Sequence, residues 1–118
     1  MESQEMINII KASPNYHKVG MILCHNGVVR GFSRSGEKVG AVEVQADYKM
    51  LDELIKKAKA RPGIVEVLVE INEGVLKVGE DIMRVCVGGD IRPNVFPVLE
   101  ELVNGIKSEV LKKEEEIS

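Results

Sequence analysis

The chain has 118 residues, of which 44% are hydrophobic and 3% aromatic, with no tryptophan and a formal net charge of -3. This is the size of one ordinary domain, whose core must be filled by aliphatic side chains. The acidic balance gives no general attraction to nucleic acid, and no apolar stretch approaches the roughly 20 residues of a membrane span. The polar start, residues 1–5, is unlike a secretory signal, so we expect a reduced, cytoplasmic protein without membrane contact.

The first third of the chain predicts two strands and a loop. A short apolar run at residues 6–10 indicates a strand, which Ser13-Pro14-Asn15 would end. Residues 19–29 indicate a longer strand with a bend at Asn26-Gly27. Residues 31–38 carry two glycines and mostly small or charged side chains, so they predict a mobile loop without a core of its own.

The middle of the chain changes from strand periodicity to helix periodicity and back. Residues 39–47 alternate apolar and polar side chains, as a half-buried strand does. Between Met50 and Ala58 the apolar residues recur at helical spacing, with Asp47 as a candidate N-cap and Arg61-Pro62-Gly63 as the end. Residues 64–71 alternate most regularly and predict the next strand.

The last part predicts two strands and a long helix. Residues 75–78 lie between glycine turns, and a strand at residues 82–87 ends in Gly88-Gly89, which either turns the chain or offers its amides to a phosphate. An amphipathic helix then starts near Asp90 or Arg92 and closes at Lys112-Lys113, before a frayed tail at residues 114–118. Its predicted core stripe is Val95, Val98, Leu99, Leu102, Val103, Ile106 and Val110. The element order predicts one α+β domain with two main helices packed on a largely antiparallel sheet.

Few residues suggest metal or thiol chemistry. Cys24 and Cys86 are too few for a disulfide framework or a metal cluster, and their apolar neighbours favour buried thiols. His17 and His25 have no cysteine or carboxylate at ligand spacing. We therefore expect no metal and no cysteine nucleophile.

Three cationic side chains border apolar segments and remain open to two readings. Lys107 borders the helix stripe, where it either snorkels over the core or serves a site. Arg30 ends a strand as a solvated charge or a ligand, and Arg92 either pairs with Asp90 or binds an anion. Together the three residues would suit an anionic substrate and an acyl group.

In their order and spacing, several segments resemble the large (catalytic) subunit of molybdopterin synthase, from about Gly20 to Lys113. Gly20-Met21-Ile22 followed by Gly27-Val28-Val29-Arg30 is similar to a strand and Gly-x-Val-Arg turn of that family. Gly74-Val75-Leu76-Lys77-Val78-Gly79-Glu80 resembles its Gly-x-Leu-x-x-Gly-(Glu/Asp) turn. Arg92 with Phe96 resembles its His-Arg-x-x-x-Phe helix start, and Ile106-Lys107 its Leu-Lys near the helix end.

The resemblance implies a single hammerhead-like domain over residues 1–118 and a sulfurtransferase activity that needs no cofactor. Such an enzyme adds two sulfurs to cyclic pyranopterin monophosphate and forms the dithiolene of molybdopterin, for a molybdenum or a tungsten cofactor. The sulfur arrives as a thiocarboxylate on the C-terminal Gly-Gly of a small ubiquitin-like partner. Two large subunits form a homodimer at the centre of a heterotetramer.

The same resemblance implies the site residues. Lys107 is the first catalytic candidate, and Lys113 the second, with Lys112 as an equal rival. Arg30, Arg92 and Arg34 are implied to bind substrate, Arg34 from the loop.

The sequence also departs from the family pattern. Ile91 stands where the family has a histidine, and Val110-Leu111-Lys112-Lys113 lacks the proline and tryptophan that precede the second family lysine. A catalytically degenerate homologue, acting as a dimeric binder of a ubiquitin-like protein or a pterin, is therefore an alternative. An unrelated structural α+β domain is a third.

Overall fold

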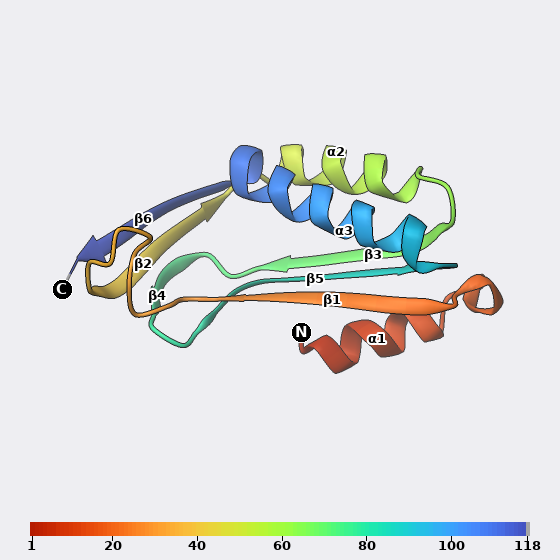
Figure 1. Cartoon of the computed structure of the whole chain (residues 1–118), viewed down its shortest axis with the longest axis horizontal. Coiled ribbons are helices and arrows are strands. Elements are labelled where there is room, and N and C mark those ends of the chain that lie inside the picture. The colour runs from red at the N-terminus through yellow and green to blue at the C-terminus, as the bar shows by residue number, and fades with distance from the viewer. Residues whose placement is uncertain (118) are drawn as a thin grey trace.

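The computed structural model describes residues 1–117, which form a body of 48 × 24 × 23 Å built from two antiparallel sheets and three α-helices (Figure 1). The central three-stranded sheet has the order β1-β5-β3, and the second has the order β4-β2-β6. The predicted α+β class with antiparallel pairing is confirmed. No helix in this part of the chain is long and apolar enough to cross a membrane.

The elements have the following bounds. The central sheet consists of β1 (Met21–Val28), β5 (Asp81–Gly89) and β3 (Ile64–Ile71). The second sheet consists of β4 (Gly74–Lys77), β2 (Val39–Ala46) and β6 (Leu111–Ile117). The helices are α1 (Ser3–Lys11), α2 (Tyr48–Lys59) and α3 (Arg92–Gly105), with a short turn η1 (Tyr16–Lys18) and a π-helical turn η2 (Ile106–Val110).

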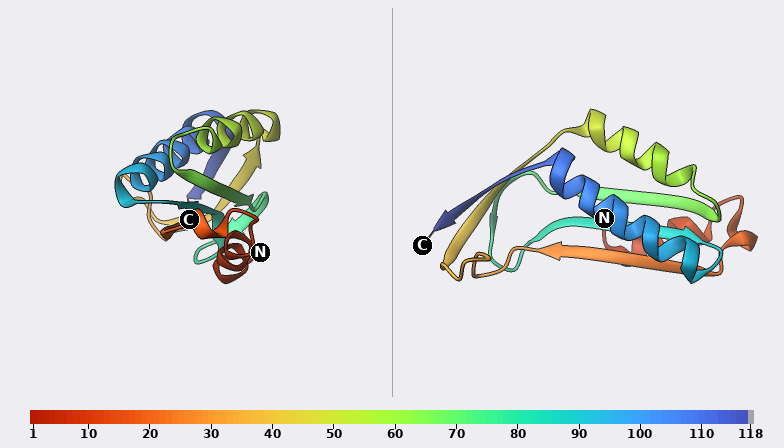
Figure 2. Two further views of the ribbon diagram at one scale, coloured as in Figure 1. Left: turned by 90° about the vertical axis from the view of Figure 1, so that its right-hand side faces the viewer. Right: turned by 45° about the horizontal axis from the view of Figure 1, so that its top comes forward.

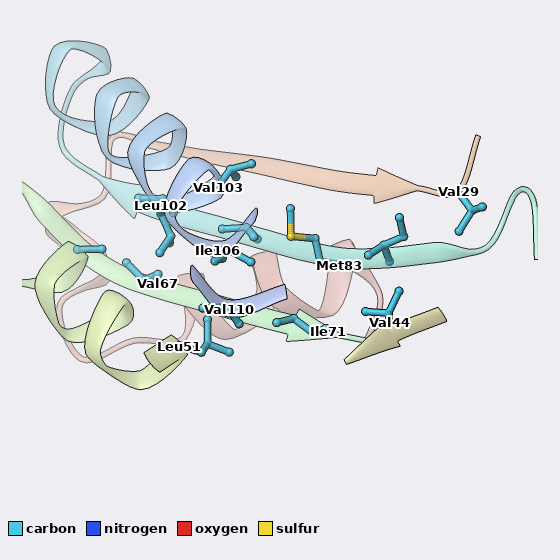
Figure 3. Close-up of a cluster of buried hydrophobic side chains, with 14 of the residues drawn as sticks. Val29, Val44, Leu51, Val67, Ile71, Met83, Leu102, Val103, Ile106 and Val110 are labelled. Atoms are coloured by element: carbon cyan, nitrogen blue, oxygen red, sulfur yellow. The ribbon is translucent and has the colours of Figure 1, made fainter. Parts of the chain in front are cut away.

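Helices cover both faces of the central sheet, α2 and α3 on one and α1 on the other (Figures 1 and 2). The main core lies between the sheets and the α2–α3 pair and reaches along β2 to the second sheet (Figure 3). It includes most of the predicted stripe of the last helix, with Val95 and Ile106 fully buried. Burial of these aliphatic side chains is the main force that holds the layers together.

Most predicted elements of the middle of the chain are confirmed. β1, β2, α2 and β3 lie within a few residues of their predicted bounds. Asp47 caps α2 as predicted, because its carboxylate accepts a hydrogen bond of 3.1 Å from the Met50 amide. Residues 31–38 form a hydrogen-bonded turn between β1 and β2, closed by the bond of 2.9 Å from the Val39 amide to the Gly31 carbonyl.

The predicted strand at residues 6–10 was wrong, because these residues belong to α1. Met6 and Ile10 are spaced four apart, so one helix face brings both against Cys86 on the central sheet. Glu2 and Glu5 form a capping box at the helix start. The capping pair and the four-residue spacing were both present in the sequence, but the high apolar content of residues 6–10 favoured a strand.

The predicted continuation of the last helix to Lys113 was also wrong, as was the frayed tail for residues 114–117, while Ser118 lies outside the described residues. The helix ends in the η2 turn at Val110, and residues 111–117 pair with β2 as strand β6. Local composition favours a helix here, since leucine, lysine and glutamate are good helix formers. The backbone bonds offered by β2 override that preference.

Two further expectations, on Cys24 with Cys86 and on Gly88-Gly89, need correction. Cys24 and Cys86 face each other across β1 and β5 and form a disulfide, so they are not free thiols. Gly88 and Gly89 lie within β5 rather than in a turn or a phosphate loop. Side chains there would meet neighbours, since a Cβ at Gly88 would lie 2.6 Å from Ile10 Cγ2 and one at Gly89 2.7 Å from Val95 Cγ2.

Candidate active site

A cavity of about 500 Å³ lies where the end of β1 meets the second sheet. Four cationic side chains and one carboxylate line it, over an apolar floor that includes Val42, Ile82 and Met83. The charged residues are Arg30, Arg34, Lys107, Lys113 and Glu115. The excess of positive charge suits a bound anion.

Arg30 and Arg34 reach this cavity because of how the chain leaves β1. The β1–β5 register shifts between Gly27 and Val28, and Val29 then turns inward and is 2% exposed. Two backbone bonds hold Val29, from its amide to the Glu80 carbonyl at 2.9 Å and from the Gly79 amide to its carbonyl at 2.8 Å. The next residue, Arg30, therefore projects from a fixed point, and Arg34 follows on the turn.

Lys107 comes from the η2 turn. Ile106 and Val110, four residues apart, are buried in the core, which leaves Lys107 at the edge of the cavity. The Asp47 amide donates a hydrogen bond of 3.0 Å to the Val110 carbonyl and fixes the end of the turn. Lys107 is exposed, so residues 1–117 of one chain do not shield its amine from water.

The pleat of β6 separates the two rival lysines. Lys113 pairs with Val44 of β2, and Glu115 pairs with Val42, so both point to the buried face of β2 and line the cavity. Lys112 pairs with Gln45 and lies on the opposite face, beside Glu43 and Glu114. The structure therefore brings Lys113 together with Lys107 and leaves Lys112 outside.

Arg92 is not brought to the cavity within one chain. It lies at the start of α3, at the end of the molecule opposite β6, beside Gly20 and Met21 (Figure 1). In the described residues it forms no ion pair with Asp90, whose carboxylate accepts bonds from the Ile91 amide at 2.7 Å and the Asn94 side chain at 2.9 Å. The Asn94 bond, and then that of Ile91, hold the pKa of Asp90 below its usual value.

His25 is a neighbour of the cavity that the sequence interpretation missed. Its side chain lies on the α3 side of β1, in a groove with Leu23 and Phe96. Burial, and secondly the positive charge of Lys107, lower the pKa of His25 below 6.5. Its position in an alternating series, Leu23, His25 and Gly27, was the available signal. Within residues 1–117 no group of three or more His, Cys, Asp and Glu side chains could hold a metal ion.

Known proteins resemble this chain in sequence. The family model described as MoaE protein matches residues 1–109. An uncharacterized protein of Methanocaldococcus jannaschii is 33% identical over 94 residues, which are 76% of this chain and 79% of the relative.

Solved structures share the fold. Molybdopterin synthase from Staphylococcus aureus matches all of this chain and 86% of its own, with a TM-score of 0.82 and 18% identity. A MoaE protein from Burkholderia ambifaria matches 96% of this chain and 75% of its own, with a TM-score of 0.79 and 24% identity. A complex of subunits 1 and 2 of the molybdopterin-converting factor from Helicobacter pylori matches 99% and 80%, with a TM-score of 0.74 and 16% identity.

Proposed function

This chain belongs to the MoaE protein family, and we propose that it acts as the large subunit of a molybdopterin synthase. In this role it transfers sulfur from the C-terminal thiocarboxylate of a small ubiquitin-like partner to cyclic pyranopterin monophosphate. One observation carries the proposal: Arg30, Arg34, Lys107 and Lys113, implied by resemblance as site residues, line one cavity. The fold shared with the Staphylococcus aureus synthase supports it.

Arg30 and Arg34 bind the phosphate of the substrate in this proposal. Each guanidinium offers forked donors that match phosphate oxygens, and such charge-assisted bonds are stronger than neutral ones. The fixed backbone around Val29 supports a defined position for Arg30. The apolar floor then leaves room for the pterin rings.

Lys107 and Lys113 serve the sulfur-transfer step. Lys107 acts as a proton donor beside the thiocarboxylate, or as a neutral amine that attacks its carbonyl carbon. In the second case the C–N bond forms as the C–S bond breaks, and the sulfur leaves for the pterin. Lys113 adds a second positive charge that stabilises the anionic groups of both reactants. Entry of the partner's tail would exclude water from the exposed Lys107 amine and strengthen these interactions.

Arg92 joins the site from a second copy of this chain in the proposed homodimer. Its place at the far end of α3 fits a partner contribution better than a contribution to the cavity of its own chain. The Helicobacter pylori structure contains both subunits of its converting factor, which supports a small-subunit partner here. Two copies of each subunit would form the heterotetramer.

The second candidate function is a dimeric binding module without chemistry. The substitution that favours it is Ile91, which is 54% exposed and cannot replace an imidazole as a hydrogen-bond donor. Such a module would still bind the ubiquitin-like protein or the pterin. The proposed synthase role is the same whether the dithiolene later binds molybdenum or tungsten.

Reconstitution separates the two functions. The protein is mixed with pyranopterin precursor and thiocarboxylated small subunit, and dithiolene formation is followed beside a known synthase. We expect product from the wild-type chain and a strong loss with Lys107→Ala. Binding of the small subunit without product, under conditions where the known synthase turns over, would support the binding module instead.

The threaded tail has its own test. An extended C-terminal peptide that enters a groove contributes affinity through its last residues. Deleting the two terminal glycines of the small subunit should therefore weaken the complex in a titration. Unchanged affinity would contradict the threaded tail.

A further inference from the structure

The side chain of His25 occupies an unusual place between two hollows of the molecule. It points from β1 toward α3, into a groove whose other walls are largely apolar, including Leu23, Leu99 and Val103. Its Nε2 atom is buried and has no hydrogen-bond partner, and no other buried side-chain nitrogen or oxygen of residues 1–117 is left unpaired in this way. A phenylalanine or leucine would fill this place without that cost.

The unpaired nitrogen lies directly behind the wall of the basic cavity. A Cβ built on Gly27 would lie 3.6 Å from His25 Nε2 and 3.5 Å from Met83 Cγ. Gly27 and Met83 both line the cavity, together with Lys107. Because glycine has no side chain, no Cβ stands between the imidazole and the cavity at this position.

A neutral imidazole with its proton on Nδ1 offers a lone pair at Nε2 to a donor. Lys107 is the cation whose charge acts on the ring, and its ammonium group has donors but no acceptor. The ring lacks a partner within residues 1–117, and Lys107 is exposed. The two groups are complementary, and a filled cavity would drive the ammonium toward the ring by removing its water.

We propose that His25 is a positioning residue for Lys107, whose ammonium donates a hydrogen bond to Nε2 when the reactants fill the cavity. This inference rests on the proposed sulfur transfer. The bond holds the Lys107 amine against the Gly27 side of the cavity, toward the acyl group. It also gives the chain an imidazole at the site, although position 91 carries isoleucine.

The inference carries a pH dependence. The charged groups that face the ring are Lys107 from η2 and Glu100 from α3. Arg84 of β5 lies on the other face of the sheet, where it pairs with Glu2, Glu70 and Asp81. Because the pKa of His25 is lowered, the ring is neutral and accepts a bond at neutral pH. Below that pKa the protonated ring repels the ammonium, so the rate of transfer should fall on the acid side.

Three variants test this in the complex of full chain and thiocarboxylated small subunit. His25→Phe fills the groove without an acceptor, His25→Asn keeps an acceptor that does not titrate, and His17→Phe is a matched control at an exposed histidine. We expect His25→Phe to lower the single-turnover rate by about 10- to 100-fold, with small-subunit affinity unchanged. His25→Asn should recover part of the rate and lose the acid limb of the pH profile, and His17→Phe should change neither.

A wild-type rate and pH profile in His25→Phe would overturn the inference, since a structural histidine predicts that result. An NMR titration of His25 separates this failure from that of the proposed function. The pKa of His25 should rise in Lys107→Ala and stay unchanged in Lys112→Ala. If the pKa of His25 does not rise in Lys107→Ala, the pairing is contradicted. If it does rise but the wild-type chain makes no dithiolene, the pairing is supported and only the sulfur transfer is overturned.

Discussion

The two sheets of the molecule differ in what covers them. The central sheet has helices on both faces (Figure 2). Its middle strand β5 is buried from Ile82 to Gly89. The second sheet is packed on one face only, and its strand β6 is exposed from Lys112 onward. The central sheet therefore provides most of the stability, and the second sheet provides charged side chains at its edge. This contrast predicts that substitutions in the two regions separate stability from activity.

The largest expected effect is on activity, at the basic cavity. Lys107→Ala removes the amine without disturbing the buried Ile106 and Val110, so the fold should persist. Loss of a nucleophile or proton donor should lower sulfur transfer by about 10³-fold. Transfer rates measure the loss of activity, and thermal melts of the same sample measure whether the fold persists. A large drop in melting temperature would show that Lys107 is structural.

The disulfide should give the largest effect on stability. Cys24 and Cys86 are separated by 62 residues along the chain and join β1 to β5 in the central sheet. Opening a loop of this size costs about 4 kcal/mol of stability. Denaturant unfolding with and without reductant measures the difference, and a Cys24→Ser/Cys86→Ser chain should not respond to reductant. Equal unfolding midpoints in both conditions would contradict a role for the bond.

Arg84 should give a smaller loss of stability. It is 8% exposed and pairs with Asp81, with Glu70 at 3.6 Å and with the Met1 carbonyl at 2.7 Å. Arg84→Ala leaves the carboxylates near one another without a counter-charge, which should cost about 2 kcal/mol, less than a fully buried pair would. Arg61→Ala, which breaks the exposed pair with Glu101, is the matched control and should cost less than about 1 kcal/mol. Similar losses in both variants would refute the contrast.

The smallest effect concerns pH at the start of α3. The pKa of Asp90 is lowered in the folded chain, so its contribution is present above 3.8 and is lost as the pH falls through the lowered pKa. The melting temperature of the wild-type chain should therefore fall more steeply in acid than that of Asp90→Asn. Asn94→Ala removes the strongest cause and should reduce the slope. Parallel curves for all three chains would exclude this contribution.

How far the sequence predicts the molecule depends on whether local pattern and tertiary context agree. Residues 64–71 alternate so regularly that their strand was predicted within its bounds. Asp47 was correctly predicted as the N-cap of α2. Residues 111–117 carry five charges and no alternation, so their pairing with β2 has no local signal.

The site shows the same division. The resemblance brought Arg30 and Lys107 forward through motifs and Arg34 through its loop, and all three line the cavity. Arg92 was also carried by a motif, but it lies outside the cavity of its own chain. It could not separate Lys112 from Lys113, since that choice follows from the pleat of an unpredicted strand. His25 carries no motif; its alternating position was a weak signal, and its buried, unpaired Nε2 and the effect of Lys107 on its pKa appear only in the structure.

The two adjacent lysines of β6 offer the most direct measurement of the central claim. Lys113→Ala and Lys112→Ala make the same chemical change one residue apart, on opposite faces of one strand. Single-turnover sulfur transfer should fall at least about 10-fold in Lys113→Ala and stay at the wild-type rate in Lys112→Ala. Equal losses in the two variants, or a loss confined to Lys112→Ala, would contradict the assignment of the basic cavity as the site of sulfur transfer.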